Sequence, residues 1–308
     1  MSEKIAILFP GQGSQSVGML SELLNESEVV KATFAEASEA LGYDLAALVL
    51  NGPEEELNQT HRTQPALLCS SVAIFRHWQQ NAPEKELVLA GHSLGEYSAL
   101  VCAGVMSLAD GVKLVEKRGQ YMQQAVPAGV GSMAAIIGLD DDVIAKACAD
   151  SAQGQVVAPV NYNSPGQVVI AGNKEAVDRA SEACKEAGAK RALPLAVSVP
   201  SHCELMKPAA EQLKGDLDAL TLNAPNVTVI NNVDVAAEQD IEAIKDALVR
   251  QLYSPVRWTE TVQAIAKMGV TQAYEFGPGK VLTGLVKRID KTIGCSAAND
   301  SASVEEAK

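Results

Sequence analysis

A serine flanked by two glycines constrains the fold of this chain more than any other feature. Residues 91–95 read Gly-His-Ser-Leu-Gly, with an apolar stretch at 86–90 before them and a helical pattern at 97–102 after them. In a strand–turn–helix context the glycines of a G-x-S-x-G pattern permit a sharp turn that exposes the central hydroxyl. The pattern therefore predicts an α/β fold with Ser93 as a nucleophile, whereas an ordinary glycine-rich loop is the alternative. The turn would also place the N–H of Leu94 and the positive end of the helix beside an oxyanion.

The rest of the chain is predicted to alternate buried strands with amphipathic helices, in two different arrangements. The first and last parts predict strands separated by helices, with the strands at 4–9, 86–90, 227–230 and 272–276 and the helices at 20–24, 29–41, 65–80, 108–125, 241–252, 259–267 and after 279. The middle part predicts the order β-α-β-β-α-β, at 132–139, 141–152, 156–161, 167–171, 174–187 and 190–197, with a hairpin turn at 163–166.

The β-α-β-β-α-β order is that of a ferredoxin-like unit. We therefore expect residues 1–127 and 199–308 to form a discontinuous α/β catalytic domain, with residues 128–198 inserted as a small α+β domain. The tail after residue 297 is polar, and we expect it to be loose.

Composition excludes several classes of protein. The chain has 308 residues, 47% of them hydrophobic, and a formal net charge of −13. These values exclude a disordered chain and disfavour general binding to nucleic acid or to anionic membranes. The sequence shows neither a secretory leader nor an apolar run of about 18 residues. The six cysteines form no C-x-x-C pair. We expect them to be reduced and mostly buried in a cytoplasmic protein without a structural metal.

A nucleophilic serine needs a base, which is usually histidine, and the chain has four. His92 adjoins Ser93, so its side chain should leave the turn in another direction. His77 fits a helix face and His61 a polar loop. His202 follows Val199-Pro200-Ser201, where the middle part ends, and clefts form at such junctions. Elimination favours His202 as the base, although a residue that begins a helix is the alternative. No aspartate partner can be chosen from the sequence.

Arg118 is a further candidate. It borders a helical stripe of apolar or small residues at 108, 112, 115, 119 and 122. A guanidinium against such a face needs an anion, which could be a ligand or a nearby glutamate.

The segment 9–14 reads Phe-Pro-Gly-Gln-Gly-Ser. It lacks the G-x-G-x-x-G spacing, and no Gly-Lys-Ser/Thr follows, so a nucleotide loop is disfavoured. A turn that delivers backbone N–H groups or the Gln12 amide to a site fits better.

These segments together resemble the malonyl-CoA:acyl carrier protein transacylases of fatty-acid synthesis. The matching pieces span nearly the whole chain in family order and are FPGQGSQ (9–15), TQPALL (63–68), AGHSLGEYSAL (90–100), KRGQYMQ (117–123), NYNSPGQVVIAG (161–172), LAVSVPSH (195–202) and GPGKVLTGL (277–285). The resemblance implies an α/β-hydrolase-like core with a ferredoxin-like insert.

The resemblance also implies roles for single residues. Ser93 would accept the acyl group, with His202 as its base and a main-chain carbonyl at Gln251 orienting the imidazole. The remaining roles concern the substrate: oxyanion N–H groups from Gln12 and Leu94, a bidentate pair between Arg118 and the malonyl carboxylate, and a place for Gln64 along the pocket.

The implied substrates are malonyl-CoA and the phosphopantetheine thiol of acyl carrier protein, without a metal or redox cofactor. Three alternatives remain: a serine esterase or thioesterase, a non-catalytic carrier scaffold, and an acyltransferase of polyketide-type secondary metabolism. Carrier protein is acidic, so we expect it to dock on a basic helix after residue 279 that carries Lys280, Lys287, Arg288 and Lys291. We expect a monomer.

Overall fold

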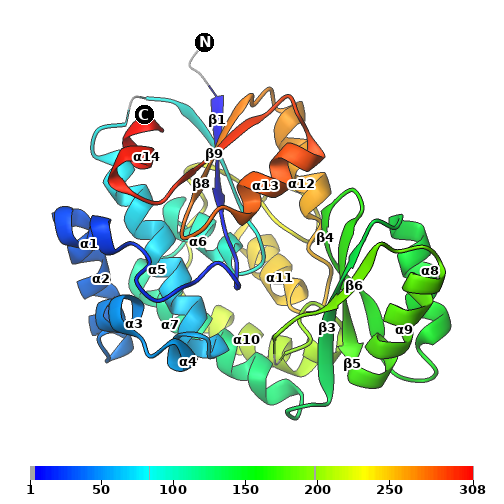
Figure 1. The fold of residues 1–308 in the computed structure, drawn as a ribbon. Coiled ribbons are helices and arrows are strands. Elements are labelled where there is room, and N and C mark those ends of the chain that lie inside the picture. The colour runs from blue at the N-terminus through cyan, green and yellow to red at the C-terminus, as the bar shows by residue number, and fades with distance from the viewer. Residues whose placement is uncertain (1–3, 83, 198, 308) are drawn as a thin grey trace.

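The computed structural model describes residues 4–82, 84–197 and 199–307, which form two separate sheets surrounded by helices (Figure 1). The first sheet is parallel, in the order β7 (Thr228–Ile230), β2 (Glu86–Gly91), β1 (Lys4–Phe9), β8 (Gln272–Phe276) and β9 (Gly294–Ala298). The second sheet is antiparallel, in the order β4 (Val157–Ser164), β5 (Gln167–Asn173), β3 (Gly131–Ile137) and β6 (Arg191–Pro194).

The parallel sheet is covered on both faces, which explains the continuous apolar run in β1. Alternate residues of this strand enter two different cores, so Ile7 packs in one and Leu8 in the other. The larger core includes residues from α2 (Glu28–Leu41), α5 (Thr60–Gln79), α6 (Gly95–Cys102), α7 (Leu108–Ala125), α10 (Lys207–Ala219) and α11 (Ile241–Gln251). The smaller core includes residues from α12 (Trp258–Lys267) and α13 (Val281–Ile289).

The antiparallel sheet carries its own core with α8 (Asp141–Ser151) and α9 (Lys174–Glu186). The order of its elements along the chain is the predicted β-α-β-β-α-β, and a two-residue turn at Pro165 and Gly166 joins β4 to β5. Backbone hydrogen bonds join β4 to the segment before α12, because Val256 bonds to both Val160 and Tyr162. The segment between α11 and α12 is therefore tied to the antiparallel sheet.

The C-terminal segment corrects one expectation. It is not loose, because β9 adds to the parallel sheet and α14 (Ser301–Glu306) follows it. Val304 and Ala307 are buried, and the indole N–H of Trp78 donates to the carbonyl of Ala307 at 3.1 Å. The polar composition misled because a few small apolar side chains suffice to anchor a short segment against a large core.

The helix α5 corrects a second expectation. It begins at Thr60, so His61 lies in its first turn rather than in a polar loop. The N–H groups of Arg62 and Thr63 bond to the carbonyl of Gln59, which starts the helix before Pro65. Short elements at α1 (Ser21–Glu26), α3 (Leu45–Asn51), α4 (Glu54–Leu57) and the 3₁₀ turn η1 (Glu204–Met206) complete the described chain.

The basic helix corrects a third expectation. Because α13 covers only Val281–Ile289, Lys280 and Lys291 lie outside it and share no face with Lys287 and Arg288. The predicted domain limits at Ser198 and Lys308 fall outside the described residues. All six cysteines are free and five are buried, as predicted. Of the helices in the described ranges, none is long and apolar enough to cross a membrane.

Candidate active site

The turn between β2 and α6 has the predicted geometry. Ser93 has a φ of 52°, a left-handed value that is rare for a residue with a side chain. A Cβ on Gly91 would overlap the backbone of Gly95, and one on Gly95 would overlap the carbonyl of Phe9. Both glycines are therefore required by close packing, and the turn they permit holds Ser93 where strand and helix meet.

Asn232 holds this turn from the other side. Its Oδ1 accepts from the N–H of Ser93 at 2.8 Å, and its Nδ2 donates to the carbonyl of Gly91 at 2.7 Å. Asn232 is fully buried and follows β7. One amide side chain thus bridges the end of the strand and the serine, which stabilises the strained conformation of Ser93.

His202 lies against the serine. Its Nε2 is 2.7 Å from Ser93 Oγ, and its Nδ1 is 2.7 Å from the main-chain oxygen of Gln251. His202 is 3% exposed, with a φ of 64°, and its backbone N–H donates to Leu252 at 3.0 Å. Burial, followed by the charge of Arg118, lowers the pKa of His202 to about 3. The imidazole is therefore neutral at pH 7 and able to accept a proton.

The other histidines have different partners. His92 Nε2 is 2.8 Å from Asn163 Oδ1, so its side chain leaves the turn away from Ser93, as predicted. His77 lies on α5 with its Nδ1 2.9 Å from Ser27 Oγ. The structure thus places one of the four histidines, His202, on the nucleophile.

Arg118 reaches the same point from α7 and is 1% exposed. Its Nη2 lies 3.4 Å from Ser93 Oγ and donates to Gln251 Oε1 at 3.0 Å, while its Nη1 donates to Gln64 Oε1 at 2.8 Å. Within the described chain its Nε has no hydrogen-bond partner, and none of the ion pairs includes Arg118. Burial lowers the pKa of Arg118, but a guanidinium stays charged in proteins. The site therefore holds a buried cation whose direct partners are neutral, so the pair with a glutamate that the sequence left open is not formed.

A cleft of about 120 Å³ opens over these groups. Its lining includes Ser93, His202, Arg118 and Gln12 together with Met133 of β3 and Asn161 of β4. A neighbouring cavity of about 240 Å³ shares Gln12, His92, Asn161 and Leu195 with it and extends to the first turn of α13. We call these two adjoining cavities the passage: Ser93 lines the inner cavity, of about 120 Å³, and the outer cavity, of about 240 Å³, lies next to it.

The remaining predicted residues take different places. Leu94 directly precedes α6 and lines the cleft. The N–H groups of the next two residues, Gly95 and Glu96, donate to the carbonyls of His92 and Ser93. Gln12 is exposed, and its Nε2 reaches Thr60 Oγ1 at 3.4 Å. Gln64 is fully buried behind Arg118.

Sequence reasoning missed two buried residues of the site, Glu96 and Asn232. Both of them bond to the groups described above. Glu96 had a signal, because it is a charged residue in an otherwise apolar helix directly after the turn. Asn232 had none, since only the fold brings it to the serine. Among the described residues no group of three metal-ligating side chains comes together.

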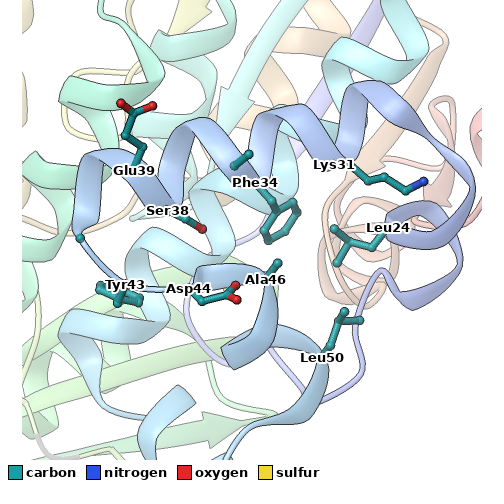
Figure 2. A pocket seen from close by; sticks show the side chains of 11 residues that line it. Leu24, Lys31, Phe34, Ser38, Glu39, Tyr43, Asp44, Ala46 and Leu50 are labelled. Atoms are coloured by element: carbon teal, nitrogen blue, oxygen red, sulfur yellow. The ribbon is translucent and has the colours of Figure 1, made fainter.

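A larger groove of about 680 Å³ lies elsewhere, between α2 and α3 (Figure 2). Leu24, Phe34 and Leu50 form its apolar floor, and Lys31, Glu39 and Asp44 stand around it. Because it brings no nucleophile and base together, it is not the catalytic site.

The turn and the serine–histidine pair are the arrangement found in enzymes that transfer or hydrolyse acyl groups through a serine. The chain belongs to the acyl transferase domain family, whose model matches residues 7–299. It is 64% identical over 304 residues to the malonyl CoA-acyl carrier protein transacylase of Salmonella typhimurium, covering 99% of this chain and 98% of that one. Identity to the enzyme of the same name from Bacillus subtilis is 47%, over 98% of this chain and 95% of that one.

Solved structures agree. An acyl carrier protein S-malonyltransferase from Vibrio cholerae superposes with a TM-score of 0.98 at 68% identity, covering 99% of this chain and 100% of that one. A malonyl-transacylase solved in complex with a type II PKS acyl-carrier protein gives a TM-score of 0.98 at 62% identity, with 99% of both chains covered. The resemblance stated from the motifs is confirmed, and the chain is an enzyme of the acyltransferase class.

Proposed function

We propose that this chain moves a malonyl group from malonyl-CoA to the phosphopantetheine thiol of an acyl carrier protein, through a malonyl ester on Ser93. One observation carries the proposal. The guanidinium of Arg118 is buried 3.4 Å from Ser93 Oγ with neutral direct partners. A carboxylate at the far end of the acyl group would supply the missing anion, and a bidentate pair would orient the thioester toward the serine.

In the first half-reaction Ser93 Oγ attacks the thioester carbonyl while His202 Nε2 takes the hydroxyl proton. The negative charge passes to the carbonyl oxygen, which the N–H of Leu94 and Gln12 would stabilise. When the C–S bond breaks, the proton returns from His202 to the departing sulfur, leaving coenzyme A and malonyl-Ser93. His202 is neutral at pH 7, as a general base must be, and its low pKa makes it a weaker base than an ordinary histidine.

In the second half-reaction the carrier thiol enters the same cleft and gives its proton to His202. The thiolate attacks the ester, the C–O bond to Ser93 breaks, and His202 returns the proton to the serine. No step requires a metal or a redox cofactor, since a thioester is already activated.

The finer architecture is also part of the proposal. We assign residues 1–127 and 199–308 to an α/β-hydrolase-like domain and residues 128–198 to a ferredoxin-like insert. The separate cores of the two sheets support this division. The passage lies between the two units, so both would contact the pantetheine arm. We assign the enzyme to the cytoplasm, as a monomer that binds neither nucleic acid nor membrane, in keeping with its net charge of −13.

The carrier protein would dock on the last turn of α13, at Lys287 and Arg288. Both side chains are exposed, and Arg288 Nη1 donates to Gln167 Oε1 at 2.6 Å, which spans the gap between the two sheets. The first turn of this helix lines the outer cavity. An acidic partner bound here would therefore lie at the mouth of the passage.

The alternative functions give Arg118 different roles. An esterase for neutral acyl chains gains nothing from a buried cation in the acyl pocket, and a non-catalytic scaffold needs no serine–histidine contact. A polyketide-type acceptor is favoured by one observation, since a relative at 62% identity was solved with a type II PKS acyl-carrier protein. Both kinds of carrier protein belong in the test.

The test is intact-mass measurement after incubation with labelled malonyl-CoA, with Ser93→Ala as the matched control. The wild-type chain should gain one malonyl group, and Ser93→Ala none. Holo carrier protein should then remove the label and appear malonylated, from whichever pathway accepts it. A full adduct on Ser93→Ala, or release of free malonate in place of transfer, would refute the proposal.

A further inference from the structure

The proposed reaction gives no role to Glu96, although this carboxyl lies in the middle of the site. Glu96 is the second residue of α6 and is 2% exposed. Its Oε2 accepts two hydrogen bonds, from the backbone N–H of Asn232 at 2.9 Å and from Gln251 Nε2 at 3.0 Å. Burying a carboxyl group costs free energy, so its presence at this position needs an explanation.

The contact between Glu96 and Gln251 fixes which way the amide of Gln251 faces. Its Nε2 donates both to Glu96 and to the carbonyl of Ser93, at 3.0 Å each. Both partners only accept here, so they require the nitrogen on their side and leave Oε1 toward Arg118. If the amide turned over, Nε2 would face the guanidinium, donor against donor.

The contact between Glu96 and Asn232 fixes the segment that holds Ser93. The backbone of Asn232 is tied to Glu96, and its side chain holds Ser93 and Gly91. Oε2 of Glu96 therefore connects Asn232, which holds Ser93, with Gln251. The main-chain oxygen of Gln251 contacts His202, and its side-chain oxygen contacts Arg118. The carboxyl group itself is not within hydrogen-bond distance of Ser93, His202 or Arg118.

We infer that Glu96 is a positioning residue for malonyl selection: through Gln251 it holds Arg118 in the orientation that receives the substrate carboxylate, and through Asn232 it holds the turn at Ser93. The inference rests on the proposed malonyl transfer. Losing the contact with Asn232 and losing the contact with Gln251 should have different consequences. Misplacing Ser93 slows acylation by any thioester, whereas misplacing Arg118 slows only acylation by a charged acyl group. Loss of Glu96 should therefore slow malonyl more than acetyl transfer.

Three substitutions test how the role of Glu96 depends on the position and the chemistry of its acceptor oxygen. Glu96→Gln keeps an oxygen at the same reach, Glu96→Asp keeps the carboxyl group but withdraws it by one methylene, and Glu96→Met keeps the length without an acceptor. Glu275→Met is the matched control, because Glu275 is another fully buried glutamate that accepts backbone N–H groups, at Leu282 and Thr283, away from the serine. The measurement is single-turnover acylation of Ser93 by malonyl-CoA and by acetyl-CoA.

We expect Glu96→Met to slow malonyl acylation about 100-fold and acetyl acylation about 10-fold or less, because the buried N–H of Asn232 loses its acceptor and Gln251 Nε2 loses one of its two. Glu96→Asp should shift the malonyl-to-acetyl ratio in the same direction, and Glu96→Gln should change it less than about threefold. Glu275→Met should leave the ratio at the wild-type value. Equal losses for both thioesters in Glu96→Met, or Glu96→Gln as impaired as Glu96→Met, would overturn the inference.

A double-mutant cycle with Gln251→Met tests whether Glu96 acts through Gln251. Gln251→Met keeps the main-chain carbonyl for His202 but removes the amide. In that background Glu96→Asp should not change the malonyl-to-acetyl ratio further, and a second, additive shift would contradict the inference. This arm remains informative even if Glu96→Met does not fold. Failure of the proposed function is distinguishable, because the wild-type chain would then form no malonyl-enzyme at all.

Discussion

Nδ1 of His202 lies 2.7 Å from the main-chain oxygen of Gln251, so an uncharged acceptor orients the imidazole. That contact requires the proton on Nδ1 and leaves Nε2 to accept from Ser93. A carbonyl stabilises the imidazolium less than the carboxylate of a Ser-His-Asp triad does. The nearby carboxyl of Glu96 bonds to the side chain of Gln251 rather than to His202. The geometry therefore suits an activated thioester better than a stable amide.

Removing the base should slow both half-reactions. We expect His202→Ala to reduce the rate of Ser93 acylation by about 10²–10⁴-fold, the range for a lost general base. Stopped-flow release of coenzyme A from malonyl-CoA measures this step directly. A burst of near-normal rate in the variant would point to another base.

The low pKa of His202 predicts a flat pH profile. The neutral imidazole of His202 is the proposed base, and because burial and Arg118 lower its pKa to about 3, it stays neutral from pH 8 down to pH 5. A histidine of ordinary pKa 6.5 would instead lose about 30-fold in kcat/KM over that range. The rate of acylation should be measured against pH in wild type and in Glu96→Gln. The variant lacks the Glu96 carboxyl, whose pKa burial raises to about 7, so titration of that group is not mistaken for titration of His202. A fall near pH 6.5 in both proteins would contradict the assignment.

Arg118 should decide between acyl groups. We expect Arg118→Ala to lose malonyl transfer by about 10²-fold or more while keeping or gaining acetyl transfer, because the guanidinium is left without an anion when acetyl is bound. Lys117→Ala is the matched control, since Lys117 is the next residue on α7 and pairs with Asp216 at the surface. Equal loss with malonyl-CoA and acetyl-CoA would make Arg118 a structural residue.

The sequence predicted the parts of the site that depend on local geometry. The turn at Ser93 follows from two glycines between a strand and a helix, and His202 follows from elimination among four histidines. Sequence could not show that Arg118 has neutral partners, because Gln64 and Gln251 lie far from it along the chain. Asn232 was missed for the same reason: its contact with Ser93 spans 139 positions.

The fold was predictable where strands are long and apolar, and less so where they are short. β9 is made of small residues and pairs only with β8, so periodicity gave no signal for it. The tail gained its order from the pairing of β9, from the burial of Val304 and Ala307 and from the bond to Trp78, which composition cannot reveal. Helix α13 is shorter than the basic helix predicted after residue 279, since Lys280 precedes it and Asp290 ends it.

The buried carboxyl of Glu96 should lower stability as the pH rises. Burial raises its pKa from 4.5 to about 7, so between these values the unfolded chain ionises while the folded chain stays protonated, and the folded state loses relative stability. Glu96→Gln removes this loss. The unfolding free energy of the variant relative to wild type should therefore rise by about 2 kcal/mol between pH 5 and pH 8. Urea unfolding at both pH values measures it, and a difference independent of pH would contradict the assignment.

The last prediction concerns the carrier protein. The chain carries −13, so its overall field repels an acidic partner, and productive encounter needs a local positive surface. Lys287 and Arg288 are exposed on the last turn of α13, whose first turn lines the outer cavity. We expect the double reversal Lys287→Glu/Arg288→Glu to raise the KM for carrier protein about 10-fold while leaving acylation by malonyl-CoA intact.

A matched reversal separates local from overall charge. Lys174→Glu/Lys185→Glu changes the net charge equally on α9, which packs on the antiparallel sheet. It should leave the KM for carrier protein within about twofold of wild type. The wild-type KM should also climb with salt, since screening shortens to about 10 Å at 0.1 M, and the α13 double variant should lose most of that dependence. An unchanged KM in the α13 variant, or an equal rise in the α9 control, would place the docking surface elsewhere.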